Sequence, residues 1–405
     1  MPFATVAETW NGDGGVTPFY RWEGPIPTKA GTMLRRELAS PEASLQQAVR
    51  TERILYSSID WLNPDKPTIV SGMVFFPKGA MPKGGWPIIA WAHGTTGVAD
   101  VCAPSFLPRS DRDKDYLNAW LEAGFAIVAT DYEGLGTPGP HPYLQYKSEA
   151  ISVLDSLRAA QNAYPNLLRD DQIIIMGQSQ GGGAALAAAY LAPSYAPELK
   201  IKGTVATGPV AHTQNFGKAH QEPLPGIFAD PSDYSNTAFE ILYFLGTIRS
   251  MDSAGIKAED YISEAGLPML RKAQSSCFWD LIGYANEIKL SIPDMYKKDI
   301  QALTTQAEKV SAFPDAKIQT PVFTGTGQAD VVAQSNFQYN FISAMCVAGT
   351  SVEWRYYPNA THSSAVMRSR VDSPAFIEKV LHGKKPQNRC GELVPPGPAQ
   401  EPEAE

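Results

Sequence analysis

The chain has no long apolar run and no excess of positive charge. No uninterrupted apolar segment in its 405 residues approaches the roughly 20 that cross a bilayer, so no membrane-spanning helix is predicted. The 34 Lys and Arg residues are outnumbered by 42 Asp and Glu, for a formal net charge of −8. Nucleic-acid binding needs a basic surface, so this balance argues against it. With 43% hydrophobic residues, the chain can form one large domain with an insertion, or two domains.

Cysteine is also scarce, and no Cys-x-x-Cys pair occurs. The four cysteines are Cys102, Cys277, Cys346 and Cys390. Without closely spaced ligands, a zinc site is not expected. An even number allows two disulfides, which need an oxidising compartment, whereas four buried free thiols would suit the cytosol. The start, Met1-Pro2-Phe3-Ala4, lacks the basic and apolar segments of a signal peptide. We therefore expect either a cytosolic protein or an exported one whose signal has been removed.

The most informative segment is a glycine-rich turn between a strand and a helix. The apolar residues 173–176 run into Gly177-Gln178-Ser179-Gln180-Gly181, a G-x-S-x-G pattern, and residues 184–189 favour a helix. This order is the nucleophile elbow of α/β-hydrolases, in which a strained serine needs very small neighbours. A phosphate-binding loop is the alternative, but no G-K-[S/T] follows and the G-x-G-x-x-G spacing is absent. We predict that Ser179 is a catalytic nucleophile.

Strands and helices alternate around this elbow. The expected strands cover residues 48–58, 68–76, 86–92, 125–130, 200–207, 320–326 and 351–357, with helices at 116–123 and 147–163. The alternation predicts an α/β-hydrolase fold, a mostly parallel sheet covered by helices. It stops between residues 212 and 316, where helical segments at 237–248 and 293–302 predict an inserted helical lid or cap.

The apolar residues of this insertion allow two interpretations. They either face an apolar pocket or build the insertion's own core, and they include Phe228, Phe239, Tyr243, Phe244, Leu245, Phe278 and Trp279. We divide the chain into an irregular N-terminal arm (1–40), a hydrolase core (41–211 and 317–393), the helical cap (212–316) and a tail (394–405). The tail is rich in Pro and Glu and is expected to be mobile.

A serine nucleophile needs a general base, and the base needs an orienting acid. In α/β-hydrolases the acid follows the serine and the histidine comes last. His362 lies in a loop directly after the strand expected at 351–357, and we predict that it is the base. The other histidines precede the serine, fall within the cap or lie in a lysine-rich segment: His93, His141, His212, His220 and His382.

The predicted acid is Asp330, in the loop after the strand expected at 320–326 and 32 positions before His362. Asp315 precedes that strand and Glu353 lies inside one, so both are less suitable. The tetrahedral intermediate also needs hydrogen-bond donors for its oxyanion. We predict the backbone N–H groups of Gln180 and of Thr95, the latter in the turn His93-Gly94-Thr95-Thr96. The alternative is that these glycines only shape turns.

Together these segments resemble the secretory lipase family. The resemblance is carried by Cys102-Ala103-Pro104-Ser105, Asp131-Tyr132-Glu133-Gly134, the elbow, Ser194-Tyr195-Ala196-Pro197-Glu198-Leu199, the Asp330 loop, Cys346-Val347-Ala348-Gly349, Tyr357-Pro358 with His362, and Cys390-Gly391. It implies an α/β-hydrolase core with a helical lid, and a triad of Ser179, Asp330 and His362. It also implies the disulfides Cys102–Cys277 and Cys346–Cys390, and hence a secreted or periplasmic protein.

The resemblance further implies a serine esterase or lipase that works through an acyl-enzyme without metal or organic cofactor. The glutamines at 178 and 180 and the His93-Gly94-Thr95-Thr96 turn depart from the family pattern and favour simple carboxylic esters. We expect a small-molecule or lipid ester substrate, transient contact with a lipid interface through the lid, no nucleic acid and no obligate protein partner.

Two alternative functions remain. A serine peptidase or acyltransferase of the same fold is the first. A peptidase would usually carry a propeller domain, and no repeated blade pattern is visible. A catalytically inactive, hydrolase-like binding protein is the second, and the intact order of Ser179, Asp330 and His362 argues against it.

Overall fold

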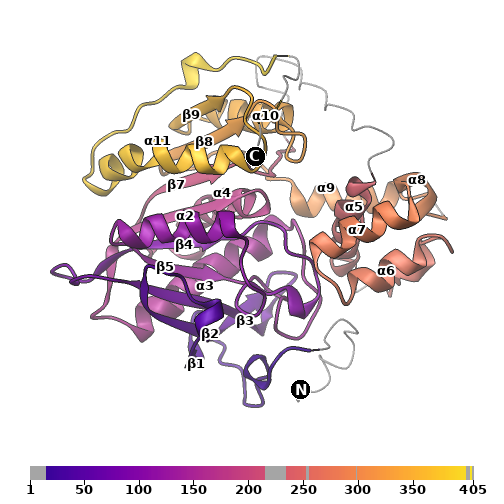
Figure 1. Cartoon of the computed structure of the whole chain (residues 1–405), viewed down its shortest axis with the longest axis horizontal. Coiled ribbons are helices and arrows are strands. Elements are labelled where there is room, and N and C mark those ends of the chain that lie inside the picture. The colour runs from indigo at the N-terminus through magenta and orange to yellow at the C-terminus, as the bar shows by residue number, and fades with distance from the viewer. Residues whose placement is uncertain (1–14, 215–233, 252–254, 298, 398–401, 404–405) are drawn as a thin grey trace.

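A nine-stranded sheet organises the chain in the computed structural model, which describes residues 15–214, 234–251, 255–297, 299–397, 402 and 403 (Figure 1). The strand order is β1-β2-β3-β5-β4-β6-β7-β8-β9. Strands β1, β2 and β3 enter the sheet antiparallel, and β3 pairs antiparallel with β5. The remaining pairs are parallel. The strands are β1 (Met33–Leu38), β2 (Ala48–Asp60), β3 (Asn63–Pro77), β4 (Trp86–Ala92), β5 (Ala126–Thr130), β6 (Leu168–Gln178), β7 (Ile201–Thr207), β8 (Val322–Gly327) and β9 (Val352–Tyr357).

Helices cover both faces of the parallel part of the sheet. Helices α3 (Tyr146–Ala163), α4 (Gln180–Tyr195) and α10 (Ser335–Val347) share one apolar cluster, and α2 (Asp111–Glu122) and α11 (Ser364–Leu381) share another. Strand β6 contributes Ile173 and Ile175 to the first cluster and Ile174 and Met176 to the second. Because successive side chains of a strand point to opposite faces, a strand covered on both sides is apolar throughout.

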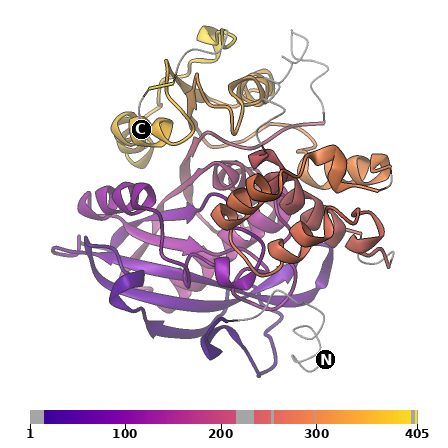
Figure 2. The ribbon, with the colours of Figure 1, turned by 45° about the vertical axis from the view of Figure 1, so that its right-hand side comes forward.

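Between β7 and β8 the chain forms helices α5 (Ser235–Arg249), α6 (Leu267–Ala273), α7 (Phe278–Ile288), α8 (Ile292–Met295) and α9 (Gln301–Ser311). Figures 1 and 2 show these inserted helices as one group at the side of the sheet. They have an apolar cluster of their own, which takes in Val98 and Tyr143 from the rest of the molecule. Phe244, Leu245 and Phe278 are buried in that cluster, whereas Phe228 lies outside the described residues.

Two local predictions were wrong. Part of the N-terminal arm, β1, pairs with β2, although half of its side chains are exposed and its sequence shows no alternation. The helix expected at 293–302 is interrupted, because Tyr296 is extended and bridges Ile262. In the C-terminal tail, the Glu403 N–H donates to the Asn359 carbonyl oxygen at 2.9 Å, and its carboxylate pairs with Arg368.

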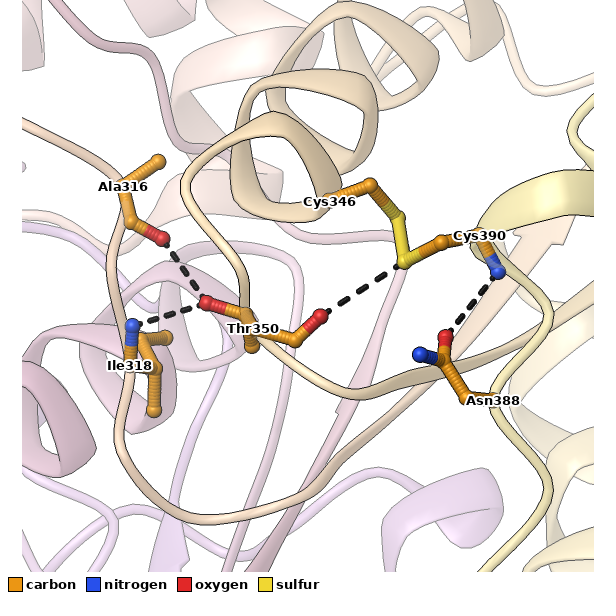
Figure 3. Close-up of a disulfide and its surroundings, with 6 residues drawn as sticks. All are labelled: Ala316, Ile318, Cys346, Thr350, Asn388 and Cys390. Carbon is orange, nitrogen blue, oxygen red and sulfur yellow. Dashed lines mark hydrogen bonds between the residues drawn. A yellow bond between two sulfur atoms is a disulfide. The ribbon is translucent and has the colours of Figure 1, made fainter.

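Two disulfides join parts of the chain that are distant in sequence. Cys102–Cys277 links the segment after β4 to the start of α7, and Cys346–Cys390 links α10 to the C-terminal segment. These are the pairs that the family resemblance implies. Figure 3 shows the second bridge beside Thr350, whose hydroxyl accepts from the Ile318 N–H at 2.8 Å and donates to the Ala316 carbonyl at 3.2 Å. The bridge therefore anchors the C-terminal segment next to the loop that enters β8.

Candidate active site

Ser179 occupies the turn between β6 and α4 with a positive φ, at φ 58° and ψ −126°. Such a conformation is costly for a residue with a side chain and persists only where its surroundings enforce it. Here the Ser179 N–H donates to the Thr207 carbonyl at 3.0 Å, and its own carbonyl accepts from Gly183 and Val210 at 3.1 Å. The serine is therefore held between the ends of two neighbouring strands and the first turn of α4.

The flanking glycines have no space for a side chain. A Cβ atom on Gly177 would lie 1.9 Å from the Gly181 carbonyl oxygen, and one on Gly181 would lie 1.9 Å from the Ala92 carbonyl oxygen. Both obstacles are backbone atoms, which cannot rotate away. The G-x-S-x-G pattern is thus a packing requirement, because strand β4, strand β6 and helix α4 meet at this point.

His362 and Asp330 form a hydrogen-bonded pair. His362 Nδ1 lies 2.7 Å from Asp330 Oδ2. Asp330 is fully buried, and its Oδ1 accepts from the N–H groups of Val332 and Ala333 at 3.0 and 2.9 Å. Its Oδ2 also accepts from Gln338 Nε2 at 2.9 Å. Because this carboxylate only accepts, His362 must carry its proton on Nδ1, which leaves Nε2 with a free lone pair.

The pair lies against the end of β7, next to the serine. A Cβ atom on Gly208 would be 3.0 Å from the His362 ring and 3.4 Å from Asp330 Oδ2. Gly208 directly follows Thr207, the residue whose carbonyl accepts from the Ser179 N–H. His362 Nε2 is buried and has no hydrogen-bond partner among the described residues. The two other acids considered from the sequence have different partners. Glu353 forms an ion pair with Arg355 on β9, and the Asp315 carboxylate accepts a hydrogen bond from the Lys317 N–H.

The turn after β4 lies beside the elbow. A Cβ on Gly94 would lie 2.0 Å from Gln178 Nε2, so this turn packs directly against the side chain of the residue before Ser179. The Thr95 hydroxyl lies 2.7 Å from the Tyr143 hydroxyl, and the Thr96 carbonyl accepts from the Phe278 N–H at 2.9 Å. The turn is therefore tied both to the core and to helix α7 of the inserted helices.

A buried polar network behind the elbow is absent from the sequence predictions. The Gln180 amide donates to Glu149 Oε1 at 2.8 Å and contacts His141 Nε2 at 3.1 Å. His141 Nδ1 in turn lies 2.7 Å from the Glu133 carbonyl oxygen, so His141 carries its proton on Nδ1 and accepts at Nε2. Glu149 also accepts from the Leu144 N–H at 3.0 Å. This network holds the side chain of the residue that follows the serine.

Burial controls the charge of this network. It raises the pKa of Glu149 to about 8 and lowers the pKa of His141 to about 3. Near neutral pH both groups are therefore neutral, and the network adds no net charge beneath the elbow. A signal for it exists in the sequence, because Glu149 falls among the apolar positions of α3, between Tyr146 and Ala150, where a solvent-facing acid is not expected.

Two cavities flank the elbow. The larger, about 460 Å³, is lined by Ser179, by core residues and by the inserted helices, including Phe239 and Tyr243. Polar side chains also line it, among them His212, Asn236, Glu240 and Ser311. The smaller, about 280 Å³, borders the turn His93-Gly94-Thr95-Thr96 and includes the exposed Trp279. His382 is exposed and directly follows the end of α11, and His220 lies outside the described residues.

Within the described parts of the chain, no group of three or more His, Cys, Asp or Glu side chains is arranged to hold a metal ion. The described helices include none that is both long and apolar enough to cross a membrane.

Comparison with known proteins gives one consistent result. The model of a family described as "Secretory lipase" matches residues 110–388. Lipase A of Moesziomyces aphidis is 25% identical over 310 residues, which cover 73% of this chain and 65% of that protein. A secreted triacylglycerol lipase of Malassezia globosa, LIP4, is 22% identical over 402 residues, which cover 93% of this chain and 83% of that protein. The match thus spans just under two thirds of the Moesziomyces protein and most of the Malassezia one.

Among solved structures, the closed state of Candida antarctica lipase A is similar with a TM-score of 0.73 at 20% identity, covering 94% of this chain and 89% of that chain. At this identity the likeness concerns the fold, which is that of the α/β-hydrolases. The family match covers more than half of the 405 residues. The chain therefore belongs to the secretory lipase family.

Proposed function

We propose that this protein hydrolyses carboxylic esters through an acyl-enzyme on Ser179, with His362 as general base and Asp330 as the orienting acid. The observation that carries the proposal is the His362–Asp330 hydrogen bond of 2.7 Å beside a serine with a positive φ in a G-x-S-x-G turn. Family membership supports the same reaction class.

In the first half of the reaction, Ser179 Oγ attacks the carbonyl carbon and His362 Nε2 takes the hydroxyl proton. Asp330 keeps the imidazole in the correct tautomer and stabilises the imidazolium. The backbone N–H groups of Gln180 and Thr95 bind the oxyanion of the tetrahedral intermediate. The ester C–O bond then breaks, and His362 gives its proton to the departing alcohol oxygen.

In the second half, water attacks the acyl-enzyme while His362 again takes a proton. The Ser179–acyl bond breaks, the carboxylic acid leaves, and the proton returns to Ser179 Oγ. No metal or organic cofactor enters these steps.

We propose that the acyl group enters the 460 Å³ cavity, which is lined by Ser179 and by Phe239 and Tyr243 of the inserted helices. The polar side chains in that cavity favour small or moderate acyl groups over long saturated chains. On this proposal the inserted helices act as a lid, and any contact with a lipid interface is made through them. Family membership and the two disulfides favour action in an oxidising space outside the cytosol.

Fluorophosphonate labelling combined with a substrate series tests the proposal. We expect the wild-type protein to be labelled and to cleave p-nitrophenyl esters between acetate and palmitate, while peptide p-nitroanilides are not cleaved. Ser179→Ala should lose both properties, with a rate at least about 10⁴-fold lower. A protein that is never labelled would be the inactive binding protein, and one that prefers peptides would be a peptidase.

A further inference from the structure

In the larger cavity, about 460 Å³, an acidic side chain lies among aromatic ones, and the reaction steps do not use it. Helix α5 lines this cavity with Asn236, Phe239, Glu240 and Tyr243. Spacings of three or four residues place these four side chains on one face of the helix. Tyr143 adds a further aromatic ring from outside the inserted helices. A saturated acyl chain makes no use of a carboxylate, so Glu240 on this face calls for another kind of acyl group.

The hydroxyl protons on one side of this cavity are already used. Ser311 Oγ donates to the Ala307 carbonyl at 2.6 Å, and a serine hydroxyl has only one proton to give. Ser311 Oγ therefore accepts from the Tyr243 hydroxyl at 3.1 Å and from His212 Nε2 at 3.3 Å. The Tyr243 oxygen then retains only acceptor capacity toward the cavity. His212, with its proton on Nε2, has a lone pair on Nδ1.

The charge state of His212 agrees with this assignment. Burial lowers the pKa of His212, while the negative charge of Glu308 acts in the opposite direction. The imidazole is therefore uncharged near neutral pH, and only one of its nitrogens carries a proton. His212 is half-buried and lines the cavity, so its Nδ1 lone pair is a second acceptor there.

Glu240 supplies a third acceptor. Its Oε1 accepts from the Tyr296 hydroxyl at 2.6 Å. The side chain is half-buried, and Oε2 is not among the fully enclosed atoms that lack a partner in the described part of the chain. Burial raises the pKa of Glu240, and the hydrogen bond from Tyr296 acts in the opposite direction. No Lys or Arg is present among the described residues that line the cavity, so a cation bound there would stabilise the ionised carboxylate.

We propose that this cavity selects acyl groups that end in a primary ammonium group, and that Glu240 determines this specificity. The proposal rests on the ester hydrolysis proposed above. A primary ammonium has three N–H donors and no acceptor, which matches the acceptors on Glu240, His212 and Tyr243. Aromatic rings also attract a cation that lies over their faces, and three of them line the cavity. The preferred substrates are thus esters of amino acids whose amine is remote from the ester carbonyl.

The most direct test compares ethyl 6-aminohexanoate with ethyl heptanoate at pH 7. Their acyl chains have the same length and differ only in the terminal group, ammonium or methyl. We expect kcat/KM for the amino ester to exceed that for the heptanoate by at least about tenfold, because the acceptors stay unpaired beside a methyl group. Ethyl 3-aminopropanoate and ethyl butanoate form a shorter pair, and a preference for the amine in either pair supports the proposal.

Two substitutions assign the selectivity to the cavity. Glu240→Gln keeps the size of the side chain but removes its charge, and it should lower the amino-to-methyl ratio about tenfold. Tyr243→Phe removes one acceptor and should lower the ratio less. Glu287→Gln is the matched control, because Glu287 is an exposed acid on α7 of the same inserted helices and is not part of the cavity lining. It should leave the ratio at the wild-type value.

A wild-type ratio of one or less in both pairs would overturn the proposal, as would an unchanged ratio in Glu240→Gln. Faster hydrolysis of ethyl 6-hydroxyhexanoate than of the amino ester would also reject it, in favour of a neutral hydroxyl group. Should Glu240→Gln not fold, the wild-type ratios and Tyr243→Phe decide. Absence of fluorophosphonate labelling and of all ester hydrolysis would instead reject the proposed function, whereas a labelled protein that prefers the heptanoate rejects the ammonium site alone.

Discussion

The elbow around Ser179 and the inserted helices α5–α9 are held in place by different means. At the elbow, backbone atoms of β4, β6 and α4 approach so closely that Gly177 and Gly181 cannot carry a side chain. The inserted helices instead have an apolar cluster of their own. In their helix α7, a Cβ on Gly283 would meet no atom within 4 Å.

A set of described contacts ties the inserted helices to the rest of the molecule. They include the Cys102–Cys277 disulfide, the Phe278 N–H bond to the Thr96 carbonyl, and the Arg249–Asp60 ion pair at 2.8 Å. The Gln145 amide also donates to the Gly246 carbonyl, and a Cβ on Gly246 would lie 2.6 Å from the Tyr143 carbonyl oxygen. The proposed chemistry therefore lies where close backbone contacts leave no room for a side chain at Gly177 or Gly181. The part that would select the substrate has its own core, and at Gly283 it has room for a side chain.

The largest effect is expected from the proposed catalytic residues, at the elbow. His362→Ala should lower kcat/KM for short p-nitrophenyl esters by about 10⁴-fold, and Asp330→Asn by somewhat less, because the acid orients the base without taking its proton. Circular dichroism checks that both variants stay folded. An Asp330→Ala protein with normal turnover would contradict the assigned acid.

A glycine pair tests the comparison directly. Gly177→Ala places a Cβ against a backbone oxygen at 1.9 Å and should destabilise the protein by several kcal/mol or prevent folding. Gly283→Ala, in the interior of α7, should be neutral or stabilise by up to about 1 kcal/mol. Urea unfolding measures both. Equal losses would show that the inserted helices are as tightly constrained as the elbow.

The two disulfides should contribute unequally. Replacing Cys102 and Cys277 by Ser should cost about 2 to 5 kcal/mol, and about 1 kcal/mol more than replacing Cys346 and Cys390, because their separations are 175 and 44 residues. Thiol titration of the denatured, unreduced protein should find no free cysteine. Four titratable thiols would show that neither disulfide forms, and the argument for export would then fail.

Stability should depend on pH through Glu149. Its pKa is about 8 in the folded protein and about 4.3 in an unfolded chain. Over that window unfolding releases a proton, so its contribution to stability is complete below about pH 4.3 and is lost as pH rises to about 8. Glu149→Gln can still accept from Leu144 and Gln180 but cannot titrate. The difference between the two unfolding curves should therefore change by up to about 1.4 kcal/mol per pH unit across this range, and a constant difference would refute the buried acid.

The smallest effect is expected from a single residue of the inserted helices. Phe239 lines the larger cavity with Ser179. Phe239→Ala should change the octanoate-to-acetate ratio of kcat/KM several-fold, while acetate hydrolysis changes little, because the lost contacts are made only by longer acyl groups. Phe337→Ala on α10, an exposed phenylalanine, is the control. Equal loss on both esters would show that this helix does not select the acyl chain.

Much of the fold and of the candidate site could be predicted because the signals are local. Residues 173–181 contain a two-sided apolar strand followed by glycines, and the steric demands behind that pattern act within one turn of chain. The strand predicted at residues 86–92 coincides with β4, since a strand buried on both faces is apolar throughout. Asp330 and His362 were predicted as a pair from their order along the chain and their place after strands, and their side chains lie 2.7 Å apart.

Other features depend on contacts between distant segments. Edge strand β1 is defined by its pairing with β2, and the break at Tyr296 by its pairing with Ile262 and its hydroxyl bond to Glu240 at 2.6 Å. The Glu149–Gln180–His141 network joins three separate parts of the chain.

The sequence by itself determined where a nucleophile could stand, because that requirement is steric and local. Only the tertiary structure decided which polar groups are buried around that position and which partners they have, because burial and pairing are properties of the assembled chain.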